Sequence, residues 1–78
     1  MNSTQCKMAR AALGWGVREL AARANVSTQT VVRFERGEQL KSQTVGNLQS
    51  VMENAGIEFI PENGGGVGVR LKRSLSAD

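Results

Sequence analysis

The sequence contains no histidine, only one cysteine and few aromatic residues, and these shortages exclude several kinds of site. Cys6 has no second cysteine with which to form an internal disulfide, and a zinc site built from Cys and His is excluded. Nucleophilic catalysis by a Ser-His or Cys-His pair is excluded because there is no histidine. We therefore expect a reduced, cytoplasmic chain that is not an enzyme and that holds no metal and no cofactor.

Long apolar runs are missing as well. No stretch approaches the roughly 18 apolar residues of a membrane span, and the first ten residues lack the apolar segment of a secretory signal. The 78 residues suffice for one small domain with a thin core. The net charge is +3, and the excess of cations falls within residues 1–56. We expect no membrane partner, and the charge favours a nucleic-acid partner only if the cations share one face.

Apolar residues at helical spacing and suitable cap residues predict four helices before Gly56. We expect them at residues 4–13, 17–24, 28–36 and 43–55. Ser27 and Ser42 are expected to cap the third and fourth helices, because their hydroxyls can accept from free amides of the first turn. Gly37 is expected to end the third helix.

After Gly56 the apolar period changes from 3.6 to 2, which predicts a β-hairpin at 57–73 and a flexible tail at 74–78. Because two strands alone are marginally stable, the apolar side chains of the hairpin need a cover. They could pack back on the first and fourth helices, or pair with a second copy across a two-fold axis. We favour the second arrangement, a homodimer whose contact residues are Ile57, Phe59, Val67, Val69 and Leu71.

The second and third expected helices are joined by a turn of three residues, 25–27. Small or apolar residues at Ala21, Val26, Val31 and Phe34 are spaced as a helix-turn-helix requires. The stretch LGWGVRELAARANVSTQTVVRFERGEQ closely resembles the helix-turn-helix family of phage repressors and Cro, also called the xenobiotic-response-element family, and the resemblance covers residues 5 to about 56. It implies a mainly α, repressor-like domain of four helices at 1–56. The hairpin that follows lies outside the common core of that family.

The resemblance also implies that the third helix enters the major groove of double-stranded DNA. Its glutamine could pair with adenine, its arginine with guanine, and its methyl groups with thymine. The positions that match base-contacting residues are Thr28, Gln29, Val32 and Arg33. Those expected at phosphates are Val17, Arg18, Ser27, Thr30, Arg36 and Lys41. Val17 departs from the family, which often has glutamine there.

In some members of this family, an arginine of the first helix and a glutamate of the third form a buried ion pair. Arg10 and Glu35 occupy those places, and we expect them to be structural. The function implied is that of a sequence-specific transcriptional regulator acting as a homodimer on a two-fold operator. Two other interpretations stay open: the outer face of the third helix is only solvated, or the fold binds another regulator protein as an antiactivator or antitoxin.

Overall fold

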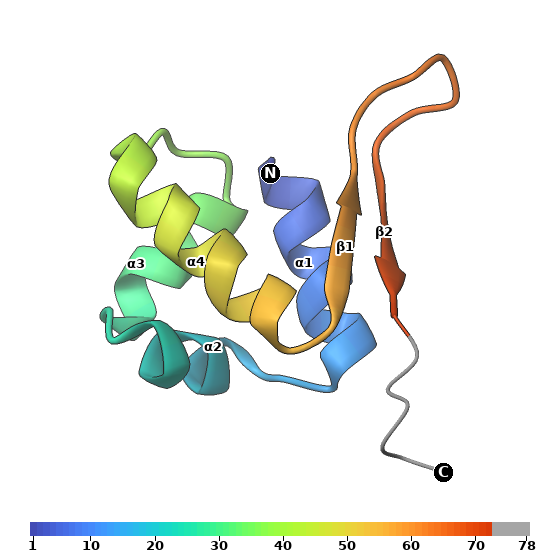
Figure 1. The fold of residues 1–78 in the computed structure, drawn as a ribbon. Coiled ribbons are helices and arrows are strands. Elements are labelled where there is room, and N and C mark those ends of the chain that lie inside the picture. The colour runs from blue at the N-terminus through green and yellow to red at the C-terminus, as the bar shows by residue number, and fades with distance from the viewer. Residues whose placement is uncertain (73–78) are drawn as a thin grey trace, which may run out of the picture.

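The computed structural model describes residues 1–72, which form four helices followed by a two-stranded antiparallel sheet (Figure 1). The elements are α1 (Ser3–Leu13), α2 (Val17–Ala24), α3 (Thr28–Glu35), α4 (Ser42–Asn54), β1 (Ile57–Ile60) and β2 (Gly68–Leu71). The predicted class, a mainly α repressor-like domain with a C-terminal hairpin, is confirmed. The tail expected at 74–78 lies outside the described residues, as does residue 73 of the expected hairpin.

Helix α1 is fixed at both ends by local hydrogen bonds. At its start, the Asn2 side chain accepts from the Gln5 amide at 2.8 Å and the Gln5 side chain accepts from the Asn2 amide at 3.0 Å, which is a capping box. At its end, Gly14 adopts a left-handed conformation with φ of 72°. The chain can therefore reverse, and the Trp15 amide donates to the carbonyl of Arg10 at 3.0 Å.

The predicted three-residue turn joins α2 to α3. Asn25 takes the left-handed conformation with φ of 56°, and the Val26 amide donates to the carbonyl of Ala21 at 3.0 Å. Ser27 caps α3, as predicted, because its hydroxyl accepts from the Thr30 amide at 3.1 Å. The turn between α2 and α3 is therefore defined by two cap residues that are recognisable in the sequence, Asn25 and Ser27.

The core gathers apolar side chains from all four described helices and from the first strand. Val31 and Phe34 of α3 point into it, as predicted from their spacing. The buried apolar residues are Cys6, Ala9, Leu20, Ala21, Ala24, Val31, Phe34, Leu48, Met52 and Ile57.

The fourth helix begins one residue earlier than predicted. Lys41, not Ser42, is the N-cap residue, and no side chain accepts from the free amides there. Leu40 and Val45 both pack against the core and stand at the spacing of a hydrophobic staple, one before the cap and one four positions into the helix. The start of α4 agrees with this apolar spacing and not with a hydroxyl cap, so the prediction that Ser42 caps it was wrong.

The hairpin lies against α1 and α4, and β2 forms its outer edge (Figure 1). Phe59 pairs with Val69 and Ile57 with Leu71, so these four side chains share one face. Ile57 is only 1% exposed, whereas Leu71 is 52% exposed. The inner face of the hairpin therefore completes the domain's own core, which is the first of the two arrangements considered above.

A buried glutamine of α1 holds the two strands together. The side-chain amide of Gln5 donates to the carbonyls of Ile60 and Gly68, both at 3.0 Å, so that one residue bridges β1, β2 and the cap of α1. Strand β2 begins only at Gly68, so Val67, which we expected in the strand, lies in the loop. The Glu62 carboxylate accepts from two glycine amides of that loop, those of Gly64 and Gly66.

Candidate nucleic-acid interface

The side of α3 opposite the core carries the four side chains predicted to reach bases. Thr28, Gln29 and Arg33 are exposed, and Val32 is half-buried beside them. Because Val31 and Phe34 turn into the core, the positions at i, i+1, i+4 and i+5 from Thr28 share the outer face. This face offers hydroxyl, amide and guanidinium groups around one apolar side chain.

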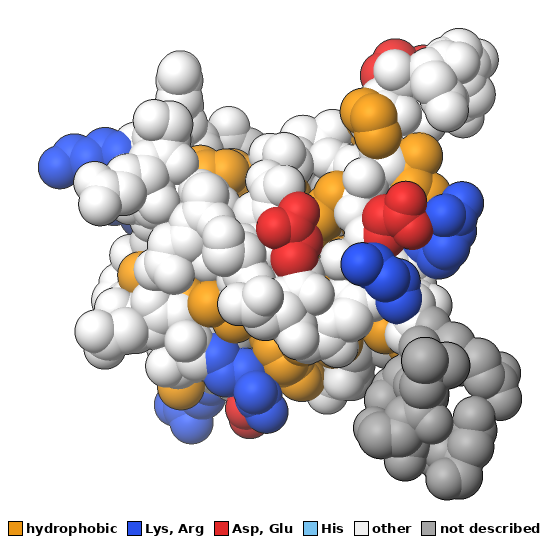
Figure 2. Space-filling view, in the orientation of Figure 1, with side chains coloured by type: hydrophobic (Ala, Val, Ile, Leu, Met, Phe, Trp, Pro, Cys, Tyr) orange, Lys and Arg blue, Asp and Glu red, His pale blue; other side chains and the backbone are white. Residues whose placement is uncertain are grey.

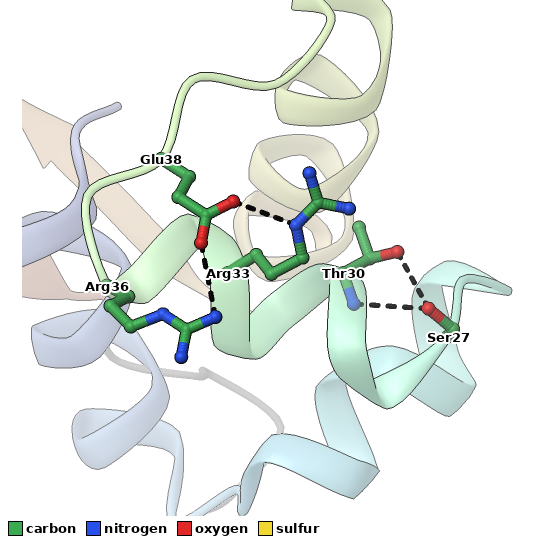
Figure 3. A network of polar contacts seen from close by, with 5 residues as sticks. All are labelled: Ser27, Thr30, Arg33, Arg36 and Glu38. Atoms are coloured by element: carbon green, nitrogen blue, oxygen red, sulfur yellow. Dashed lines mark hydrogen bonds and ion pairs between the residues drawn. The ribbon is translucent and has the colours of Figure 1, made fainter.

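The first turn of α3 presents two hydroxyls close together. Ser27 Oγ and Thr30 Oγ1 lie 2.8 Å apart, and Ser27 is exposed (Figure 3). Ser27 already accepts from the Thr30 amide as the cap of the helix. Ser27 and Thr30, two of the residues expected at phosphates, therefore orient each other's hydroxyl groups.

Two arginines at the end of α3, one in its last turn and one at its C-cap, share one carboxylate. Arg33 Nε lies 2.9 Å from Glu38 Oε1, and Arg36 Nη2 lies 3.1 Å from Glu38 Oε2 (Figure 3). The hydrogen bond from Arg33 is the main reason that the pKa of Glu38 is lowered, and the charge of Arg36 adds to it. All three side chains are exposed.

Glu38 is the residue of this surface that our sequence analysis did not identify. The signal was present, because a helix that ends at a left-handed glycine reverses the chain and returns the next residue to the last turn. Gly37 has φ of 99°, and the Glu38 amide donates to the carbonyl of Arg33 at 3.1 Å.

Two helix starts have amides that no side chain caps. Gly16 precedes α2 and Lys41 precedes α4, and neither has an accepting side chain. Val17 is half-buried, and Arg18 and Lys41 are exposed. Free amides and the positive end of the helix dipole attract anions. Figure 2 shows Lys and Arg side chains over α2 and near the start of α4.

Arg10 and Glu35 are in contact inside the domain and not on this surface. Arg10 Nε and Nη2 each lie 2.8 Å from one oxygen of Glu35, and Nη1 donates to the carbonyl of Trp15 at 3.1 Å. Burial opposes the charge of Glu35, but the hydrogen bonds from Arg10 and Cys6 outweigh it, so the pKa of Glu35 is lowered. The pair joins α1 to α3.

Cys6 belongs to the same network. Its thiol donates to Glu35 Oε2 at 3.3 Å, and it is fully buried. Burial and the neighbouring carboxylate raise the pKa of the Cys6 thiol to about 12. The cysteine therefore stays a protonated core residue, without the thiolate that reactive cysteines need.

A family model of Cro/C1-type helix-turn-helix domains matches residues 7–57, from the middle of α1 to the start of β1. The chain belongs to this helix-turn-helix family, whose members are DNA-binding regulators and generally not enzymes. In general terms, then, the protein is a DNA-binding regulator. No curated protein matches the chain in sequence. Within residues 1–72, no helix is both long enough and apolar enough to cross a membrane.

Proposed function

We propose that the protein is a sequence-specific transcriptional regulator that inserts α3 into the major groove of double-stranded DNA. The observation that carries this proposal is the exposed face of α3, where Gln29 and Arg33 stand one turn apart. An amide can pair with two positions of adenine and a guanidinium with O6 and N7 of guanine. Thr28 and Val32 supply methyl groups for thymine.

Contacts to phosphates would fix the domain along the DNA backbone. The uncapped starts of α2 and α4 offer amides at Val17 and beside Lys41, and the side chains of Arg18 and Lys41 add charge. Ser27 and Thr30 offer hydroxyls at the start of α3, and Arg36 offers a cation at its end. These contacts set register but carry no sequence information.

We further propose a homodimer on a two-fold operator, because one recognition helix reads only a few base pairs. Three of the five residues expected in the dimer contact, Ile57, Phe59 and Val69, pack on the core of their own chain. In the described residues each strand pairs only with the other, so both keep an open edge. The exposed Leu71 lies on one of them. The proposed interface is therefore the outer edge of β2, with Leu71 at one end of the strand and Val67 in the loop at its other end.

Two variants that each remove one positive charge test the proposed readout. The preferred site is first selected from random duplex DNA. Arg33→Ala is then expected to cost about 1–3 kcal/mol on that site and to relax preference at one base pair. Lys41→Ala is expected to weaken binding to all sequences about equally and to reduce the salt slope by about one unit, because a phosphate contact ignores sequence. Affinities are measured on selected and random duplexes at several salt concentrations.

Equal losses on both kinds of DNA in both variants would show that Arg33 does not read a base. If the wild-type protein binds no DNA, and both variants behave like it, α3 has another ligand. A protein partner, as for an antiactivator or antitoxin, then becomes the better interpretation, and the half-buried Val32 would be part of that contact.

A further inference from the structure

Glu38 is a carboxylate just beyond the end of α3, beside the exposed face that carries hydroxyl, amide and guanidinium groups around Val32. It accepts from Arg33 Nε at 2.9 Å and from Arg36 Nη2 at 3.1 Å, each with a different oxygen (Figure 3). An acidic group beside DNA repels phosphate unless it is neutralised. Here two guanidinium groups neutralise it, and the three side chains together keep one positive charge.

The backbone holds Glu38 in this place. Gly37 reverses the chain at the end of α3 with φ of 99°, and the Glu38 amide then donates to the carbonyl of Arg33 at 3.1 Å. Arg33 is thus bonded to Glu38 twice, once through its main chain and once through its side chain. The main-chain bond fixes the backbone of Glu38, and its carboxylate is then held by Arg33 and Arg36.

The contact at Nε decides which edge of the Arg33 guanidinium remains available. A guanine presents O6 and N7 to two adjacent N–H donors of one plane. With Nε engaged by Glu38, the Nη1 and Nη2 groups form the remaining pair, and in Figure 3 they point away from Glu38. An arginine that is already ordered loses less side-chain freedom on binding than a free one.

We propose that Glu38 is a positioning residue for DNA recognition: it orients Arg33 so that the Nη edge of its guanidinium meets guanine. This inference rests on the proposed function, because it requires that α3 read DNA. Arg36 is held by the second oxygen of the same carboxylate, which keeps Glu38 between the two arginines.

The test compares Glu38→Ala with a matched control, Glu58→Ala. Both carboxylates bind an arginine and are similarly exposed, with side chains 43% and 45% accessible, but Glu58 pairs with Arg70 on the hairpin at 2.9 Å. Sequence preference is measured position by position for the wild type, both variants, Arg33→Ala and the double variant Glu38→Ala/Arg33→Ala. Thermal melting of each protein verifies folding, and Glu38→Gln, which keeps the side-chain length, serves as a second variant.

We expect Glu38→Ala to reduce the preference at the base pair that depends on Arg33 by about three- to tenfold, as a part of the discrimination that one bidentate arginine supplies. Glu58→Ala is expected to leave that preference unchanged. In the Arg33→Ala background, removal of Glu38 should have no further effect on preference, because the residue acts through Arg33.

A preference that survives in full in Glu38→Ala and Glu38→Gln overturns this inference alone, and so does a uniform change on all sequences. A wild-type preference that Arg33→Ala does not alter also overturns it. A wild-type protein with no sequence preference overturns the proposed function, and this inference with it.

Discussion

At the scale of single residues, Glu35 has the largest expected effect on stability. It is buried, it receives two hydrogen bonds from Arg10, and the Cys6 thiol donates to it as well. The removal of one partner of a buried ion pair leaves the other charge uncompensated, which is more damaging than the loss of the attraction alone. A substitution of Glu35 should therefore reduce the stability of the fold even in the absence of DNA.

Glu35→Ala is expected to lower the free energy of unfolding by about 3 kcal/mol, the lower end of the range for buried pairs, because Arg10 loses its counter-charge but keeps 21% of its side chain exposed. The loss should appear in denaturant or thermal unfolding without DNA. Glu19→Ala is the control, since Glu19 pairs with Arg23 at 2.7 Å on the surface, where ion pairs contribute little. A normal melting curve for Glu35→Ala, combined with weak DNA binding, would contradict the structural role.

The same pair predicts how stability depends on pH. The pKa of Glu35 is lower in the folded protein than its ordinary value of 4.5, so below that value the unfolded chain binds a proton that the folded one does not. The stabilisation is complete above about pH 4.5 and is lost as the pH falls toward the folded pKa. Glu35→Gln, which cannot titrate, should lack this part of the acid-induced loss in unfolding curves recorded between neutral and acidic pH.

At the scale of elements, the attachment of the hairpin depends on Gln5. Its side-chain amide donates to the carbonyls of Ile60 and Gly68, and its side-chain oxygen accepts from the Asn2 amide at the start of α1. Ile60 and Gly68 are partly buried, and a carbonyl that loses its donor away from water carries a penalty of up to about 1–3 kcal/mol. The two strands and the first helix should therefore respond together to a change at this position.

Gln5→Glu keeps the shape and the acceptor toward Asn2 but removes both donors. We expect faster backbone amide exchange in β1 and β2 and a lower melting temperature, because a carboxylate would face two carbonyl oxygens. The same exchange of amide for carboxylate at the exposed Gln39 should change neither measurement. Equal exchange rates in Gln5→Glu and the wild type would show that the inner apolar face alone holds the hairpin.

The sequence was most informative where a local cap decides the structure. Helix α2 has the predicted bounds, and Asn25 ends it in the left-handed conformation that asparagine tolerates better than most residues. Contacts between residues far apart in the sequence could not be predicted from such local patterns. Gln5 is a polar residue near the N-terminus, and its burial follows from strands that lie 55 and 63 residues further along the chain. The pairing of Glu38 with Arg33 could not be predicted without knowing that the chain reverses at Gly37 and brings Glu38 back to the last turn of α3.

At the scale of the whole molecule, assembly is the property to test. Leu71 is the large apolar side chain that the described structure leaves most exposed, and it lies on the outer strand. Leu71→Lys is therefore expected to convert the proposed homodimer to a monomer without loss of the fold. Sedimentation and circular dichroism measure the two properties separately. A wild-type monomer at high concentration, or a dimer unaffected by this substitution, would contradict the proposed interface.

Helix α1 connects the hairpin to the recognition helix. Gln5 donates to the hairpin, and Arg10 pairs with Glu35 of α3. If two copies meet through their hairpins, α1 links each recognition helix to the dimer interface. Because α1 is hydrogen-bonded at both contacts, this link is rigid. Such a dimer cannot follow half-sites that rotate away from each other. Insertion of about five base pairs, roughly half a turn of DNA, between the half-sites should therefore abolish binding to one of them. Undiminished affinity for the lengthened duplex in gel-shift titrations would show that the two halves are flexibly joined.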